Sequence, residues 1–66
     1  MDLILDGKFG TLPIEVKFST STSIKQLHSL SNFMAQHNAP IGVVVNNSRK
    51  IRLLKDNIIQ IPVSFI

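Results

Sequence analysis

A run of apolar residues near the middle of the chain, Ile41-Gly42-Val43-Val44-Val45, constrains the fold most. It shows no alternation of polar and apolar side chains, which is typical of a strand buried on both faces of a sheet. The segment before it is different, because its apolar residues recur at helical spacing: Ile24, Leu27, Leu30, Phe33 and Met34. Ser23 and Gln26 have the spacing of a capping box, and the helix should end near His37, before Pro40.

The N-terminal part has the pattern of a β-hairpin. The apolar run Leu3-Ile4-Leu5 leads into Asp6-Gly7, which is a strong turn signal. Residues 12–18 then alternate with period 2, so that Ile14, Val16 and Phe18 face one way and Glu15 and Lys17 the other. We expect a connection of about five residues, 6–10, between the two strands, with Pro13 near the start of the second strand.

The remaining segments predict two further strands and an apolar tail. The strands are expected at residues 51–54 and 58–61, joined by a tight turn at residues 55–57, and Pro62 precedes the tail. The predicted order is therefore β-β-α-β-β-β. A helix between the strand of Glu15 and the strand of Val43 forms a crossover, so these two strands should be parallel. The predicted class is α/β with a small mixed β-sheet, and one helix leaves one face of that sheet open.

Size and composition limit the class of protein. With 66 residues and no cysteine, the chain should form one small domain, residues 1–66, without a disulfide or a Cys-based zinc site. No apolar run approaches the roughly 20 residues of a membrane span, and no signal peptide is recognisable, so we expect a soluble cytoplasmic protein without a membrane partner. The mean hydropathy of +0.24 is high for such a short chain and predicts a homo-oligomer or a place in a larger assembly.

Three ionisable residues of the hairpin could carry chemistry. Asp2 should lie opposite Glu15 or within a residue or two of it, and Glu15 and Lys17 share a face because side chains alternate along a strand. Two carboxylates suit Mg²⁺, which prefers oxygen ligands. A neighbouring lysine can orient water or offset charge on a phosphate. The alternative is that Glu15 and Lys17 are ordinary solvent-facing residues of the strand.

This arrangement resembles the D-x(n)-E-x-K signature of the restriction-endonuclease-like PD-(D/E)xK superfamily. The whole chain is similar to a C-terminal domain of unknown function that follows the ATPase module in many prokaryotic AAA-type ATPases. The matching parts are the Asp2-Leu3-Ile4 strand, the Asp6-Gly7 turn, the motif Leu12-Pro13-Ile14-Glu15-Val16-Lys17, the Ser19–Ser23 linker, the Ile24–Met34 helix, the Gly42–Val45 strand and the closing segment Ile59–Ile66.

The resemblance implies a partial restriction-endonuclease-like core. Asp2 and Glu15 would be metal ligands for Mg²⁺, and Lys17 would be the catalytic lysine. The family's first helix and first strand have no counterpart before Asp2, and no phosphate-binding loop of an ATPase occurs, so the resemblance implies a truncated domain whose ATPase module would act in trans.

A basic cluster follows the buried strand. Arg49, Lys50 and Arg52 could contact the backbone of a nucleic acid, or they could be charges that face water and prevent edge-to-edge pairing of strands. The function expected first is a non-catalytic folding and interaction module. The alternatives are a Mg²⁺-dependent DNA endonuclease, acting as a homodimer similar to junction resolvases, and a nucleic-acid-binding remnant without catalysis.

Overall fold

The computed structural model describes residues 3–8 and 10–66 of the chain. The elements follow the predicted β-β-α-β-β-β order and end in a short 3₁₀ turn. They are β1 (Leu3–Gly7), β2 (Gly10–Val16), α1 (Ile24–His37), β3 (Gly42–Asn46), β4 (Arg52–Lys55), β5 (Ile58–Pro62) and η1 (Val63–Phe65). The α/β class and the mixed sheet expected from the sequence are confirmed.

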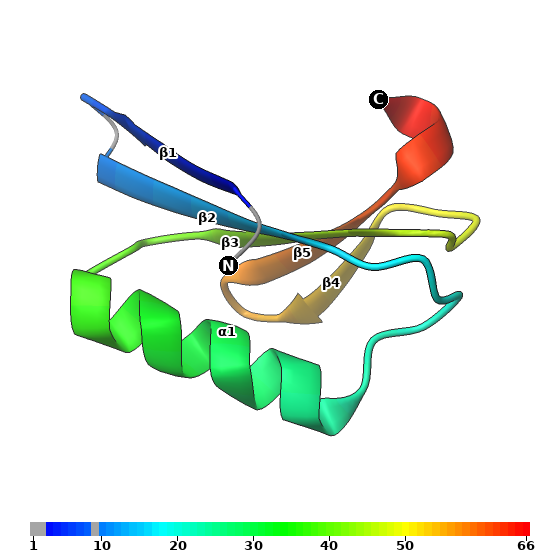
Figure 1. The fold of residues 1–66 in the computed structure, drawn as a ribbon, viewed down its shortest axis with the longest axis horizontal. Coiled ribbons are helices and arrows are strands. Elements are labelled where there is room, and N and C mark those ends of the chain that lie inside the picture. The colour runs from blue at the N-terminus through cyan, green and yellow to red at the C-terminus, as the bar shows by residue number, and fades with distance from the viewer. Residues whose placement is uncertain (1–2, 9) are drawn as a thin grey trace.

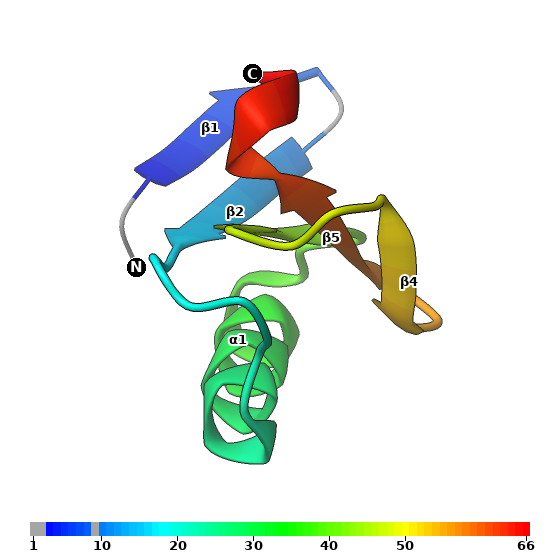
Figure 2. The same cartoon turned by 90° about the vertical axis from the view of Figure 1, so that its right-hand side faces the viewer.

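The strands in the described part of the chain form one five-stranded sheet in the order β1-β2-β3-β5-β4. The inner strands β2, β3 and β5 are parallel, which the crossover predicts for β2 and β3, and β1 and β4 pair antiparallel at the two edges. Helix α1 lies on one side of the sheet and η1 on the other, as Figures 1 and 2 both show. The two faces of the sheet therefore have very different cover.

The hairpin is tighter than the sequence suggests. Strands β1 and β2 pair from Leu3–Ile14 to Gly7–Gly10, which leaves two residues between them, so the expectation of a five-residue connection was wrong. Gly10 has φ 100°, a value that glycine adopts without strain. The Thr11 hydroxyl donates a hydrogen bond of 2.8 Å to the Asp6 carboxylate. These features keep the strands paired to the tip and place Pro13 inside β2.

Helix α1 has the predicted ends. The Ser23 hydroxyl accepts from the Gln26 N–H at 3.2 Å and the Gln26 side chain accepts from the Ser23 N–H at 3.0 Å, which completes the capping box. Asn38 ends the helix in a left-handed conformation, φ 53°. Ile24 is 75% exposed, so the apolar stripe starts one turn later than expected, at Leu27. No helix in the described ranges is long and apolar enough to cross a membrane.

The core lies between α1 and one face of the sheet. Its buried residues are Leu30, Met34, Ala39, Val44 and Ile58. Gly42 lets the helix approach the sheet, because a Cβ atom there would lie only 2.7 Å from the Met34 sulfur. Glu15 pairs with Val44, so Glu15 lies on the helix side of β2. Ile14 and Val16 lie on the other side, and Phe18 lies beyond the strand and is 82% exposed.

Loss of the capping box should weaken the domain measurably. Ser23→Ala removes the acceptor for the Gln26 N–H, and we expect the free energy of unfolding to fall by about 1 kcal/mol. Ser29→Ala, at an exposed position within the same helix, is the matched control and should be neutral or slightly stabilising. Urea unfolding followed by circular dichroism measures both. Equal stabilities of the two variants would contradict the role of the cap.

Candidate functional site

Glu15 and Lys17 lie together at the end of β2. The Lys17 Nζ is 3.1 Å from a Glu15 carboxylate oxygen, and the two side chains are 39% and 18% exposed, respectively. The shared face predicted for the E-x-K motif is therefore confirmed. The third residue of the predicted site, Asp2, lies outside the described residues. Within the described ranges, no group of three or more His, Cys, Asp or Glu side chains lies close enough to hold a metal ion.

The ion pair of Glu15 and Lys17 is compatible with two roles. A partly exposed ion pair contributes at most about 1 kcal/mol, so the carboxylate is not locked in place by the lysine. It can serve as a structural contact at the strand end. It can also serve as the E-x-K half of a metal site, in which the carboxylate binds Mg²⁺ and the ammonium offsets charge on a phosphate.

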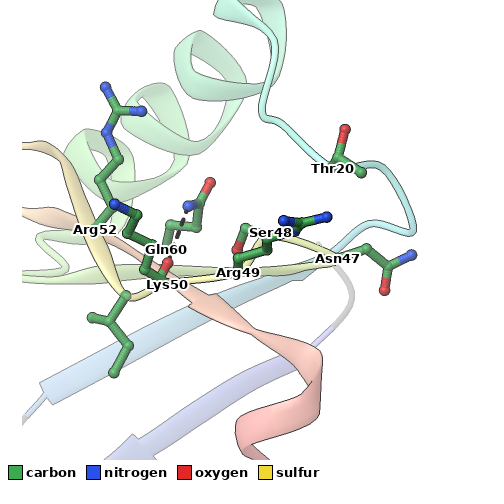
Figure 3. A pocket seen from close by; sticks show the side chains of 8 residues that line it. Thr20, Asn47, Ser48, Arg49, Lys50, Arg52 and Gln60 are labelled. Atoms are coloured by element: carbon green, nitrogen blue, oxygen red, sulfur yellow. Dashed lines mark hydrogen bonds between the residues drawn. The ribbon is translucent and has the colours of Figure 1, made fainter.

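A second site forms around the basic cluster, where the chain leaves β3. A pocket of about 580 Å³ is lined by Thr20, Asn47, Ser48, Arg49, Lys50, Ile51, Arg52 and Gln60, and we call it the basic pocket. Figure 3 shows the cations on the loop and on β4, with Thr20 on the linker across from them. Arg49, Lys50 and Arg52 are exposed, and none of the three forms an ion pair with a carboxylate of the described residues. The structure thus gathers the three predicted nucleic-acid-binding residues around one hollow.

Two loops form this pocket, and hydrogen bonds hold them together. The Asn47 N–H donates to the Ser19 carbonyl at 2.9 Å, and the Asn47 side-chain amide donates to the Phe18 carbonyl at 2.9 Å. The linker after β2 and the loop after β3 are therefore joined directly at the ends of their strands. Thr20 is held near the basic loop for this reason.

Gln60, which lines the pocket, forms a buried amide pair with Asn46, which does not line it. Asn46 is fully buried, and its side-chain amide donates to the Gln60 Oε1 at 3.0 Å and to the Thr22 hydroxyl at 3.2 Å. Its Oδ1 accepts from the Ser48 N–H at 3.1 Å, and Gln60 donates in turn to the Lys50 carbonyl at 3.4 Å. One asparagine therefore connects the linker, β3, β5 and the basic loop.

Sequence reasoning missed the uncharged polar residues that line the pocket, Thr20, Asn47, Ser48 and Gln60, and it missed the buried Asn46 that holds Gln60. For Asn46 and Gln60 the sequence did contain a signal. Asn46 follows directly on a buried apolar run, and Gln60 interrupts an apolar strand, so each is a polar residue where burial was expected. Such residues are usually hydrogen-bonded to a partner, which here is the other of the two.

The face of the sheet away from α1 carries an apolar groove of about 500 Å³. Its strand residues are Leu12, Ile14, Val16, Val43, Val45 and Ile61. Leu3 flanks the groove on β1, and Val63 and Ile66 flank it at the C-terminal turn. We call these nine residues the open sheet face. Every one of them is apolar, and within the described part of the chain only the short η1 and the last residue lie over this side.

Comparison with known proteins gave no match, whether to a family model, a curated protein or a solved structure. The resemblance to the PD-(D/E)xK superfamily and to the ATPase-linked domain therefore stays a prediction that rests on the residues themselves. What the chain does has to be argued from the ion pair, the basic pocket and the open sheet face.

The buried amide pair gives a sharp test of the architecture around the pocket. Asn46→Leu leaves the Gln60 side chain without its main partner in a buried place, and we expect the free energy of unfolding to fall by about 1–3 kcal/mol. The double variant Asn46→Leu/Gln60→Met removes both polar groups and should recover part of that loss. A double-mutant cycle in urea measures the coupling. If the two losses simply add, the pair does not stabilise the pocket in the way described.

Proposed function

We propose that this chain is a non-catalytic assembly module, a nuclease-like domain of the kind that follows the ATPase in prokaryotic AAA-type ATPases. In this proposal it acts through the open sheet face, and the occupant of that face is a second copy of the chain. The observation that carries the proposal is the apolar groove on the side of the sheet opposite α1. The ATPase module would then be brought together with the paired domains as a partner in trans.

Burial on the two faces supports the need for a cover. On the helix side, Val44 and Ile58 are 1% and 0% exposed. On the other side, Val45 of the inner strand β3 is also buried, at 4%, but Leu3 on the edge strand remains 48% exposed and Ile66 83% exposed. The accessible surface of 4616 Å² is also larger than the roughly 4,200 Å² typical of a folded monomer of this mass. Contiguous exposed apolar residues of this kind are typical of interaction surfaces.

Charge does not oppose pairing of two copies at the open sheet face. The chain has a formal net charge of +3, so two copies repel each other wherever their basic surfaces meet. The nine residues of the open sheet face carry no charge, and two copies can therefore pack there without like-charge contacts. Sheets pack face to face about 10 Å apart when their inner side chains are apolar, which is the geometry offered here.

The nuclease-like part of the proposal rests on the order in which the elements follow one another along the chain. The E-x-K pair lies at the end of the hairpin's second strand, and a linker, a helix and a buried parallel strand follow. This is the arrangement that the resemblance implies for the core of the superfamily. It is consistent with descent from such a domain, and Glu15 and Lys17 would then be the remains of its site.

Self-association through the open sheet face should be lost when a charge is placed on it. We expect the wild type to be a dimer at micromolar concentration and Ile14→Lys to be a folded monomer, because the lysine would be buried without a partner in the dimer. Ile24→Lys is the matched control, since it makes the same change at an exposed helix position. Sedimentation velocity measures the mass, and circular dichroism confirms the fold.

Two results would contradict this assembly. One is a wild type that sediments as a 7.3 kDa monomer throughout the micromolar range. The other is a control variant that dissociates as much as Ile14→Lys. Val63→Lys, at the edge of the open sheet face and outside the sheet itself, replaces Ile14→Lys if that variant does not fold.

A second candidate function, metal-dependent cleavage of phosphodiesters, is favoured by the contact between Glu15 and Lys17. Under our proposal, duplex, single-stranded and branched DNA should all remain intact with Mg²⁺ or Mn²⁺. Gel electrophoresis of labelled DNA measures this directly. Metal-dependent cleavage that Glu15→Ala and Lys17→Ala each abolish would establish the second candidate and refute the non-catalytic module.

A further inference from the structure

We propose that the basic pocket binds the phosphate of a nucleotide, either free or as part of a nucleic-acid strand. The cations supply the charge, the Ser48 hydroxyl supplies a hydrogen-bond donor, and the remaining polar wall accommodates the sugar or the base. This inference goes beyond the proposed function and does not depend on it, because the pocket and the open sheet face share none of their residues.

The position of the pocket in the fold is the first argument. Thr20 lies on the segment that follows β2, and Ser48, Arg49 and Lys50 lie on the segment that follows β3. Strands β2 and β3 are parallel neighbours, so both segments leave the same edge of the sheet. In open α/β sheets, ligands bind in the crevice outside the carboxyl ends of the strands. The pocket occupies this place.

Charge is the second argument. Three cations, Arg49, Lys50 and Arg52, line one hollow, and no carboxylate of residues 3–8 and 10–66 lines it with them. Within the described residues their charges are not neutralised by ion pairs. Like charges held this close repel each other, and an anion with several acceptor oxygens relieves that repulsion. Phosphate has this chemistry, and Arg and Lys are its usual partners.

An unpartnered hydroxyl is the third argument. Ser48 lines the pocket, yet its buried Oγ makes no hydrogen bond within the described part of the chain. A buried polar group without a partner costs about 1–3 kcal/mol, so it calls for a physical reason. Rotation between staggered χ1 positions, about 120° apart, changes the direction of the hydroxyl at little cost. A phosphate oxygen in the pocket would provide the missing acceptor.

The volume of the basic pocket favours a ligand larger than a single phosphate ion. The pocket measures about 580 Å³, within the range of about 300–1,000 Å³ that is typical of small-molecule and cofactor sites. A phosphate group alone would leave most of this space empty. Ile51 offers an apolar contact, and Asn47 offers side-chain donors and acceptors, which suits a sugar or a base beside the phosphate.

The experiment measures binding to the full chain by fluorescence anisotropy, with a labelled single-stranded oligonucleotide and a labelled AMP as two separate probes, and with unlabelled AMP and inorganic phosphate as competitors. Displacement by AMP supports a site for a free nucleotide. Binding of the oligonucleotide that AMP does not displace supports a site for a nucleic-acid strand. The proposal is overturned if neither labelled probe binds.

Charge variants locate the site. Arg49→Gln/Lys50→Gln should weaken binding about tenfold or more, because two charged hydrogen-bond donors are lost. For the oligonucleotide, the salt dependence should fall by about 1.4 in the slope of log K against log salt. Lys8→Gln/Lys25→Gln removes the same charge at exposed positions outside the pocket and should weaken binding less than about twofold. Equal losses in both double variants would overturn the proposal.

Ser48→Ala separates binding from folding. The hydroxyl has no partner in the unbound protein, so its removal should leave the free energy of unfolding unchanged or raise it. The same variant should weaken phosphate binding about three- to tenfold. Unchanged affinity would overturn the role of Ser48. Reduced stability would show that the hydroxyl has a structural partner, and would overturn it too.

Discussion

One constraint determines the structure: a single α-helix among the described residues has to cover a sheet of five strands. In the described part of the chain, α1 is the one α-helix and it packs on one face of five strands. That contact buries Leu30 and Met34, and Gly42 favours it because a Cβ atom there would lie 2.7 Å from the Met34 sulfur and would force that side chain to shift. Among the described residues, the C-terminal turn is then the only element that covers the apolar side chains of the opposite face. The open sheet face is a direct consequence of this imbalance.

On the helix side, the apolar core ends at a buried polar contact. Asn46 is the last residue of β3 and is fully buried, so its amide must find partners inside the protein. It finds them on Gln60, Thr22 and the Ser48 backbone, and these bonds fix the linker and the basic loop at the same edge of the sheet. The geometry of the basic pocket therefore depends on the hydrogen bonds of Asn46, a residue that does not itself line the pocket.

Local patterns were enough to predict the helix, the buried strand and the parallel crossover, because capping and hydrophobic period are properties of neighbouring residues. Features that depend on pairing between residues far apart in the sequence could not be predicted from local patterns. The tight hairpin needs the register that joins Gly7 to Gly10. The partnership of Asn46 and Gln60 needs the register that joins Val44 to Gln60, since a shift of one residue would turn Gln60 to the other face. The side on which α1 packs also had no local signal, and it decides that Ile14 and Val16 are left without a helix.

The two surfaces face opposite sides of the sheet, and this relation links assembly to binding. Gln60 lies beside Val44 on the helix side, whereas Val43, Val45 and Ile61 point the other way. Two copies that pack through their open sheet faces would therefore bury the apolar groove and keep both basic pockets exposed on the outside. Such a pair presents two phosphate sites held at a fixed separation. A nucleic-acid strand long enough to reach both would bind more tightly than a single nucleotide, because the second contact becomes intramolecular. A pair formed through the open sheet face would therefore carry two basic pockets, where a single copy has one.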